Sequence, residues 1–170
     1  RKVKVGKQEL AMALDLIERE PGYAALPLAK ARTFTRLAGL PEAQSPIVPL
    51  IINDLEEPMP SIRRCLAWGR LLRRAIESYG EPLRVAVLGT GGLSHSIGEP
   101  TMGWIDEEFD HACIEHFEDG EDTRLAAFLT DALPRTGNGA HEIRDWVVAH
   151  AAAGSKGFQL IDYFPSPQTL

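Results

Sequence analysis

The most restrictive stretch of the sequence is an apolar run that ends in a glycine-rich turn, Val85 to Leu88 followed by Gly89 to His95. A short apolar run bounded by glycine is typical of a buried strand in an α/β sheet. Reactive groups in open α/β sheets gather just beyond the carboxyl ends of strands, so His95 stands where catalytic side chains are usually found. The alternative is an ordinary loop histidine whose ring is satisfied by a backbone group, and this stretch alone does not decide between the two.

Strand-like and helix-like segments alternate along the chain. Apolar runs predict strands at 47–53, where Pro49 favours an edge position or a bulge, at 83–88 and at 158–164. Apolar residues at helical spacing predict helices over 7–20, 29–37, 61–79, 104–117, 122–133 and 139–153. Such alternation predicts a layered α/β fold, and a length of 170 residues predicts a single domain over residues 1–170.

Particular residues are expected to begin and end these helices. Ser61, Asp122 and Asn138 are the side chains that we expect to cap the helices that follow them. Gly80 and Gly154 stand where a left-handed residue commonly ends a helix.

The charge and the cysteines narrow the setting in which the protein works. The net charge is −6 and no long block of like charge occurs, so neither nucleic-acid nor anionic-membrane binding is indicated. Cys65 and Cys113 lack the CxxC spacing of metal or redox sites, which fits a reducing compartment. No signal-peptide pattern or membrane-length apolar run is present, so we expect a cytoplasmic protein.

Glu142 is the second candidate for chemistry. On a helical wheel of the last long helix it stacks over Trp146 and leans toward the interior, whereas His141 lies on a more polar side with Arg144 and Asp145. A buried carboxylate is costly unless it is paired, hydrogen-bonded or bound to a metal, and the positive helix N-terminus favours its ionised form. Glu142 therefore suits a metal ligand, the alternative being a first-turn glutamate that interacts with its own helix terminus.

The other histidines carry weaker signals. His111 and His116 are five residues apart, so they do not share one helix face and we expect ordinary helix residues. His150 falls near the apolar side of its helix, which favours a core or subunit-contact position over a ligand.

Several motifs occur in a fixed order: Val87–His95, Gly98–Asp110 and Gly137–Trp146, preceded by Ile47–Arg74 and followed by Tyr163–Pro167. Together they resemble the catalytic subunits of class III extradiol ring-cleavage dioxygenases, of the protocatechuate 4,5-dioxygenase and gallate dioxygenase type. The resemblance implies an α/β layered sandwich, phosphorylase/hydrolase-like and incomplete here, in which helices flank a mixed central sheet.

The resemblance also implies a site. In that family two histidines and one glutamate hold a non-haem Fe(II), which leaves positions open for a catecholate and O2. Glu142 corresponds to the glutamate ligand and His95 to the acid–base histidine beside the iron. The implied substrates are a catecholic small molecule and O2, and relatives assemble with themselves or with a small partner subunit. The residues that would bind the substrate are not identified by these motifs.

The sequence departs from the family at the other two iron ligands. They are histidines of the N-terminal half, and no histidine precedes His95 in this sequence. We therefore expect the C-terminal portion of a larger catalytic domain, the alternative being a noncatalytic partner or scaffold subunit of the same family. An α/β hydrolase that uses Ser94 and His95 is disfavoured, because adjacent residues on one loop do not easily form a Ser–His pair and the Gly-x-Ser-x-Gly elbow is missing.

Overall fold

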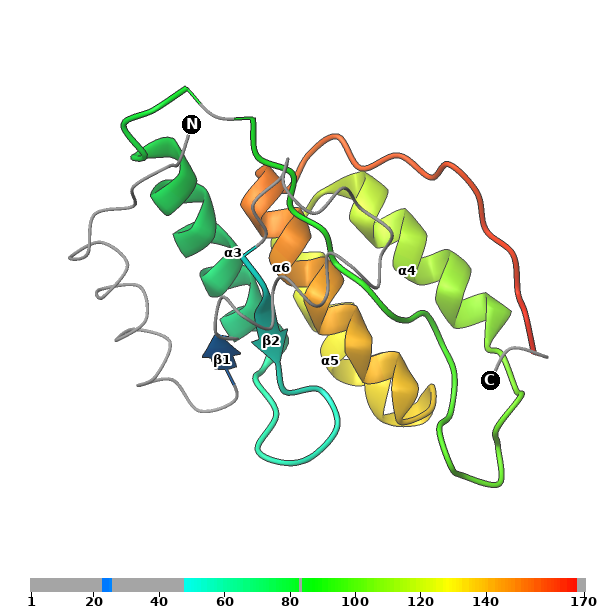
Figure 1. Ribbon diagram of the computed structural model, residues 1–170. Helices are drawn as coiled ribbons and strands as arrows, with labels where there is room; N and C mark the ends of the chain where they lie inside the picture. The colour runs from blue at the N-terminus through cyan, green and yellow to red at the C-terminus, as the bar shows by residue number, and fades with distance from the viewer. Residues whose placement is uncertain (1–22, 26–47, 83, 168–170) are drawn as a thin grey trace, which may run out of the picture. The chain divides into compact units, whose positions relative to one another are not determined.

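The computed structural model describes residues 23–25, 48–82 and 84–167 (Figure 1). The chain divides into two compact units, Arg1–Met59 and Pro60–Leu170. The helices predicted over 7–20 and 29–37 lie outside the described residues.

The first unit contains a two-stranded antiparallel sheet. Strand β1 (Tyr23–Ala25) pairs with β2 (Leu50–Ile52), so that Tyr23 stands opposite Ile52. Strand β2 starts directly after Pro49, which has no N–H to donate to a ladder. The central part of the strand predicted over 47–53 is thereby confirmed.

The described part of the second unit is mainly helical. Its elements are α3 (Ile62–Glu77), α4 (Glu107–Asp119), α5 (Asp122–Ala132), the 3-10 turns η1 (Leu133–Arg135) and η2 (Gly139–Glu142), and α6 (Ile143–Ala153). The four predicted helices of this unit are therefore present, with shifted ends. Within the described residues, no helix is long and apolar enough to span a membrane.

The N-terminal caps are partly as predicted. Ser61 caps α3, because its hydroxyl accepts the Arg64 N–H at 3.3 Å. Asp122 does not cap α5: Glu121 occupies the cap position without a side-chain bond, and the Asp122 carboxylate pairs with Arg70 of α3 instead. An ion pair with Arg70, which is distant in the sequence, thus takes the place of the expected hydrogen bond to the first turn of α5.

The C-terminal ends differ in the same way. Helix α3 ends at Glu77 with Ser78 as its cap, so the ending predicted at Gly80 is wrong by a few residues. The Ser78 N–H donates to the Arg74 carbonyl at 2.9 Å and its hydroxyl to Ala75, which satisfies the last turn without a left-handed residue. Gly154 does end α6 in the left-handed conformation, as predicted.

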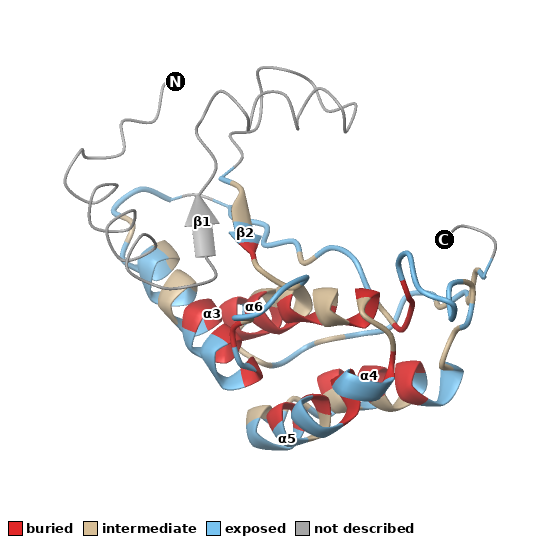
Figure 2. Ribbon diagram, turned by 90° about the horizontal axis from the view of Figure 1, so that it is seen from below, coloured by how far each residue is buried: buried red, intermediate tan, exposed pale blue. Residues whose placement is uncertain are grey.

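The core of this unit includes the packing of α3 against α6, and Figure 2 shows buried residues along α3, α4, α5 and α6. Gly69 of α3 allows the close approach, because a Cβ there would overlap the Val148 carbonyl and the Ala151 side chain of α6. The side of α6 that the sequence predicted to be polar is also buried, at Arg144, Val148 and Ala152. That prediction is wrong because α6 has neighbours on both sides.

The strands predicted at 83–88 and 158–164 are not observed as paired strands. Residues 84–88 and 158–164 form no backbone–backbone hydrogen bond with any part of the chain that the structure describes. Their apolar side chains are largely exposed, with Leu88 at 84%, Ile161 at 97% and Phe164 at 81%. The prediction is wrong for the described residues because a strand requires a partner that an apolar run cannot itself supply.

His150 is a core histidine, as predicted, and its environment gives a testable pH dependence. Its ring meets Phe117 edge-on at 5.1 Å, and its Nε2 lies 3.8 Å from Asp122 Oδ1. Burial lowers the pKa of His150 from 6.5, and the Asp122 charge opposes that shift in part.

The unfolded chain therefore binds this proton at a higher pH than the folded chain, so protonation favours unfolding. We expect the free energy of unfolding, measured by urea titration, to fall as the pH is lowered below about 6.5. His150→Gln should flatten this dependence, and His111→Gln, at an exposed position, is the matched control for loss of a histidine. An equal pH slope in the wild type and in His150→Gln would contradict the assignment.

Candidate functional site

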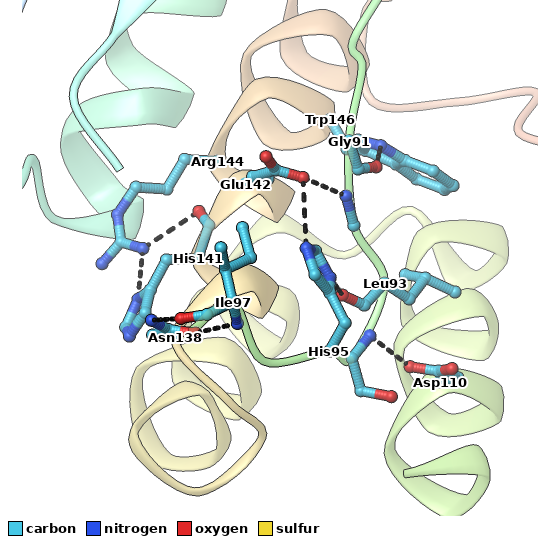
Figure 3. Close-up of polar contacts among 12 residues, drawn as sticks. Gly91, Leu93, His95, Ile97, Asp110, Asn138, His141, Glu142, Arg144 and Trp146 are labelled. Atoms are coloured by element: carbon cyan, nitrogen blue, oxygen red, sulfur yellow. Dashed lines mark hydrogen bonds and ion pairs between the residues drawn. The ribbon is translucent and has the colours of Figure 1, made fainter. Parts of the chain in front are cut away.

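The structure brings His95 and Glu142 together. His95 lies on the loop that follows the 84–90 segment, and Glu142 is the last residue of η2, directly before α6. The imidazole Nε2 is 3.8 Å from the Glu142 Oε2, and Figure 3 shows the two side chains pointing toward one another. Two residues chosen separately from the sequence thus face each other across one site.

The hydrogen bond at the far side of the ring fixes the tautomer of His95. Its Nδ1 lies 2.9 Å from the Leu93 carbonyl, and a carbonyl only accepts, so Nδ1 carries the proton. In the neutral ring Nε2 is then the basic nitrogen and it faces Glu142. The two interpretations of His95 offered by the sequence therefore apply to different ring nitrogens. Nδ1 is satisfied by a backbone carbonyl, and Nε2 remains available for proton transfer.

The Glu142 carboxylate is held by the glycine-rich loop before His95 and not by the start of its own helix. Its Oε2 accepts the Gly92 N–H at 2.8 Å, and no side-chain cap bond is formed at the start of α6. This bond directs the side chain toward the loop that carries His95. The side chain is 34% exposed, so it is less buried than the helical wheel suggested. Within the described residues its second oxygen, Oε1, has no hydrogen-bond partner.

Two glycines make room for this pair. Gly91 has φ +80°, a conformation that favours glycine, and a Cβ there would overlap the Glu142 carboxylate. A Cβ on Gly139 would overlap the His95 imidazole. The Glu142 side chain therefore lies directly against the backbone of Gly91, and the His95 ring lies directly against the backbone of Gly139.

Asp110 is a buried residue of the site that the sequence analysis did not single out. It is 2% exposed on α4, and its carboxylate accepts the Ser94 N–H at 2.8 Å and the Tyr163 hydroxyl at 2.7 Å. Burial raises the pKa of Tyr163, as does its bond to Asp110. Burial also raises the pKa of the Cys113 thiol, with the Asp110 charge adding to the effect. The sequence signal was an acidic residue directly after Phe109, on the side of the helix that faces the core.

A second set of contacts supports the segment that carries Glu142. The Asn138 side chain does not cap η2; it accepts the Ile97 N–H at 2.7 Å and donates to the Ile97 carbonyl at 2.9 Å. Trp146 donates its indole N–H to the Gly91 carbonyl at 2.8 Å. The loop that bears His95 is thus joined to the η2–α6 segment at both of its ends.

Arg144 fixes the other side of η2. Its Nε donates to the Pro60 carbonyl at 2.9 Å, and its Nη1 lies 2.7 Å from His141 Nδ1. Because a guanidinium only donates, His141 accepts through Nδ1. These bonds explain why Arg144 is buried although the helical wheel placed it on a polar side.

Ser94 is placed for structure and not for nucleophilic attack. Its hydroxyl accepts the Asp106 N–H at 2.8 Å, and the residue is 2% exposed. The basic nitrogen of His95 faces Glu142 and not Ser94. A Ser–His pair of the hydrolase type is therefore not assembled here.

The residues present fit part of an iron site. Glu142 offers an outward carboxylate oxygen, which suits a divalent cation. Across 23–25, 48–82 and 84–167 there is no group of three His, Cys, Asp or Glu residues that could hold a metal ion. His111 and His116 contact Tyr163 and Phe128 rings at 4.9 and 4.5 Å, as expected of ordinary helix residues. The described chain thus provides one plausible ligand and not a complete set.

A cavity of about 350 Å³ lies beside the loop that supports His95, but neither His95 nor Glu142 lines it. Its lining residues are Glu99, Thr101, Trp104, Leu133, Pro134, Arg135, Gly137, Asn138 and His141. It therefore does not identify where a substrate of the His95–Glu142 pair would bind.

The relatives found by comparison with known proteins include dioxygenases. Gallate dioxygenase of Pseudomonas putida is 34% identical over 102 residues, which cover 60% of this chain and 30% of that protein. The 2,3-dihydroxyphenylpropionate/2,3-dihydroxicinnamic acid 1,2-dioxygenase of Paraburkholderia xenovorans is 26% identical over 172 aligned residues, covering 74% of this chain and 54% of that protein. The chain therefore spans about a third to a half of the length of these relatives.

A third relative bears a different name. The 8-amino-7-oxononanoate synthase of Methylocella silvestris is 50% identical over 60 residues, which cover 35% of this chain and 17% of that protein. A match over so small a share of both chains shows no family.

The family model described as the catalytic LigB subunit of aromatic ring-opening dioxygenase matches residues 37–166. This range includes His95, Glu142 and the loops that hold them. The family expected from the ordered motifs is confirmed, and with it an α/β class for the whole family domain, although the described part is mainly helical. The chain belongs to the family of catalytic LigB subunits of aromatic ring-opening dioxygenases.

Proposed function

We propose that the protein carrying this sequence is an extradiol ring-cleavage dioxygenase of catecholic aromatic acids. In this proposal Glu142 is one ligand of a non-haem Fe(II) and His95 is the acid–base group beside it. The observation that carries the proposal is the approach of His95 Nε2 to Glu142 Oε2 at 3.8 Å, on loops whose glycines leave room for both side chains.

Each residue has a distinct task. Fe(II), when bound, would supply adjoining positions for a catecholate and O2 and a path for electrons between them. Glu142 would present Oε1 to the metal while its Oε2 stays on the Gly92 N–H. His95 would take a proton from a substrate hydroxyl at Nε2, because Nδ1 already donates to Leu93. The nearby carboxylate would stabilise the resulting imidazolium, and the proton could later return to the product.

The substrate class is supported by the relatives. The two similar enzymes are named after gallate and 2,3-dihydroxyphenylpropionate, which are both aromatic acids with adjacent hydroxyl groups. We propose the same class here, acting with O2. The remaining ligands and the mixed central sheet would come from further polypeptide, with this chain as the C-terminal portion of a larger catalytic domain. We further propose a cytoplasmic assembly, either a homo-oligomer or a complex with a small partner subunit.

The experiment separates the two roles. We expect the full-length protein, loaded with Fe(II), to consume O2 and form a yellow ring-fission product with protocatechuate, gallate or a related diol. His95→Ala should lower turnover by about 100-fold and retain iron, since a positioned acid–base group contributes on that order. Glu142→Ala should lose iron itself. Oxygen uptake and metal analysis are the measurements.

The chain offers matched controls for both substitutions. His111→Ala and Glu115→Ala alter exposed residues of α4 and should keep both iron and turnover. Loss of iron in His95→Ala with iron retained in Glu142→Ala would reverse the proposed roles. No ring-fission product from any of these diols would count against the activity.

A noncatalytic partner or scaffold subunit is the second candidate. It is favoured by one observation, that no three-residue metal-binding group occurs among the described residues. The sequence of the complete gene separates the two candidates. Two histidines upstream of residue 1 would support the enzyme, and a natural start near residue 1 would support the noncatalytic subunit.

A further inference from the structure

One buried carboxylate joins three separate segments around the candidate site. Asp110 belongs to α4, Ser94 to the His95 loop and Tyr163 to the segment that follows α6, and the carboxylate accepts a hydrogen bond from each of the other two. Figure 3 shows Asp110 beside the loop, on the side away from Glu142. We propose that Asp110 and Tyr163 are positioning residues that fix the orientation and tautomer of the His95 imidazole.

The route runs through a single peptide group. The Ser94 N–H and the Leu93 carbonyl belong to the same planar unit, so fixing one end fixes the other. Asp110 holds the N–H end at 2.8 Å, and His95 Nδ1 donates to the carbonyl end at 2.9 Å. A hydrogen bond donated by the N–H also polarises the peptide, which makes its carbonyl a stronger acceptor for Nδ1–H.

The loop needs such an anchor. Gly89, Gly91 and Gly92 precede it, and glycine gives the backbone more conformations than any other residue. The Asp106 N–H, just before α4, also donates to the Ser94 hydroxyl at 2.8 Å. This second bond restricts rotation of Ser94 away from Asp110. The Tyr163 hydroxyl at 2.7 Å occupies the other carboxylate oxygen and limits rotation of the Asp110 side chain.

This inference rests on the proposed acid–base role of His95, but its test does not require catalysis. The test uses the full-length protein, prepared without iron and with 15N-labelled histidine, and long-range 1H–15N spectra report which ring nitrogen of His95 carries the proton. The wild type should show the Nδ1–H form. Asp110→Ala should lose this preference and show a mixture of tautomers. Asp110→Asn should retain it, because the amide oxygen can still accept the Ser94 N–H.

Leu129→Ala is the matched control for general destabilisation. Leu129 is fully buried on α5, so its truncation weakens the core without touching the contacts of Asp110. A tautomer change in Asp110→Ala but not in Leu129→Ala supports the positioning role. An unchanged tautomer in Asp110→Ala, or an equal change in Leu129→Ala, overturns it.

A second variant keeps the test decisive if Asp110→Ala loses its helical circular dichroism. Tyr163→Phe then serves, since it removes only the hydroxyl: partial loss of the Nδ1–H form supports the inference and an unchanged spectrum overturns it. The proposed function fails separately. If Asp110→Ala changes the tautomer while His95→Ala in the full-length protein keeps full turnover, the positioning role holds and the acid–base role is wrong.

Discussion

Replacing Gly139 with alanine is expected to lower ring-opening turnover of the full-length protein by about 100-fold, because misplacing a reacting group by about 1 Å has an effect of that order. The new Cβ would overlap the His95 imidazole, which would have to leave its place beside Glu142. Gly139 has no positive φ that only glycine tolerates, so the backbone itself should accept alanine. The expected result is therefore an iron-retaining, folded and slow enzyme.

The measurements are oxygen uptake, metal content and circular dichroism. Gly80→Ala is the matched control, because a Cβ there meets nothing within 4 Å and should leave turnover unchanged. If Gly139→Ala kept full turnover, the His95 ring could not depend on its position over Gly139, and the proposed acid–base geometry would be wrong.

Replacing Gly69 with alanine is expected to have the largest effect on stability. Its Cβ would lie 2.9 Å from the Ala152 nitrogen and would overlap the Val148 carbonyl and the Ala151 side chain. The neighbouring atoms are mostly backbone of α6, so they cannot move aside cheaply. Overpacking of this kind costs about 3 kcal/mol, and the better helix propensity of alanine offsets about 1 kcal/mol of it.

We therefore expect a net loss of about 2 kcal/mol in the free energy of unfolding, measured by urea titration followed by circular dichroism. Gly80→Ala is again the control, with no expected change. An unchanged midpoint in Gly69→Ala would show that α3 and α6 can separate without loss, contrary to the close packing that the structure describes.

Local patterns in the sequence predicted the helices well, because helical spacing and caps depend on neighbours along the chain. Ser61 caps α3 and Gly154 ends α6 as expected. The ends that failed, at Gly80, Asp122 and Asn138, are those where a bond from elsewhere or a tighter last turn replaced the local signal. The burial of Arg144 failed similarly, since its partner, the Pro60 carbonyl, is 84 residues away.

The candidate site was predictable only in part. His95 stands out as a histidine after an apolar run, and Glu142 as a first-turn carboxylate with an inward lean, but the family resemblance assigned their roles. Their distance of 3.8 Å depends on the loop and on η2 meeting in space, which no spacing rule contains. Asp110 went unnoticed because an acidic residue in the first turn of a helix is usually explained by the helix dipole.

The unpaired apolar segments at 84–88 and 158–164 bear on how copies of the chain would behave at high concentration. Side chains such as Leu88 and Ile161, suited to a sheet, also favour pairing between molecules when no strand covers them. Pro82 stands just before the first segment, and Asp162 interrupts the second. Proline and charge at such places hinder the growth of intermolecular sheets. Pro82 and Asp162 are therefore expected to hinder self-association wherever the two segments remain uncovered.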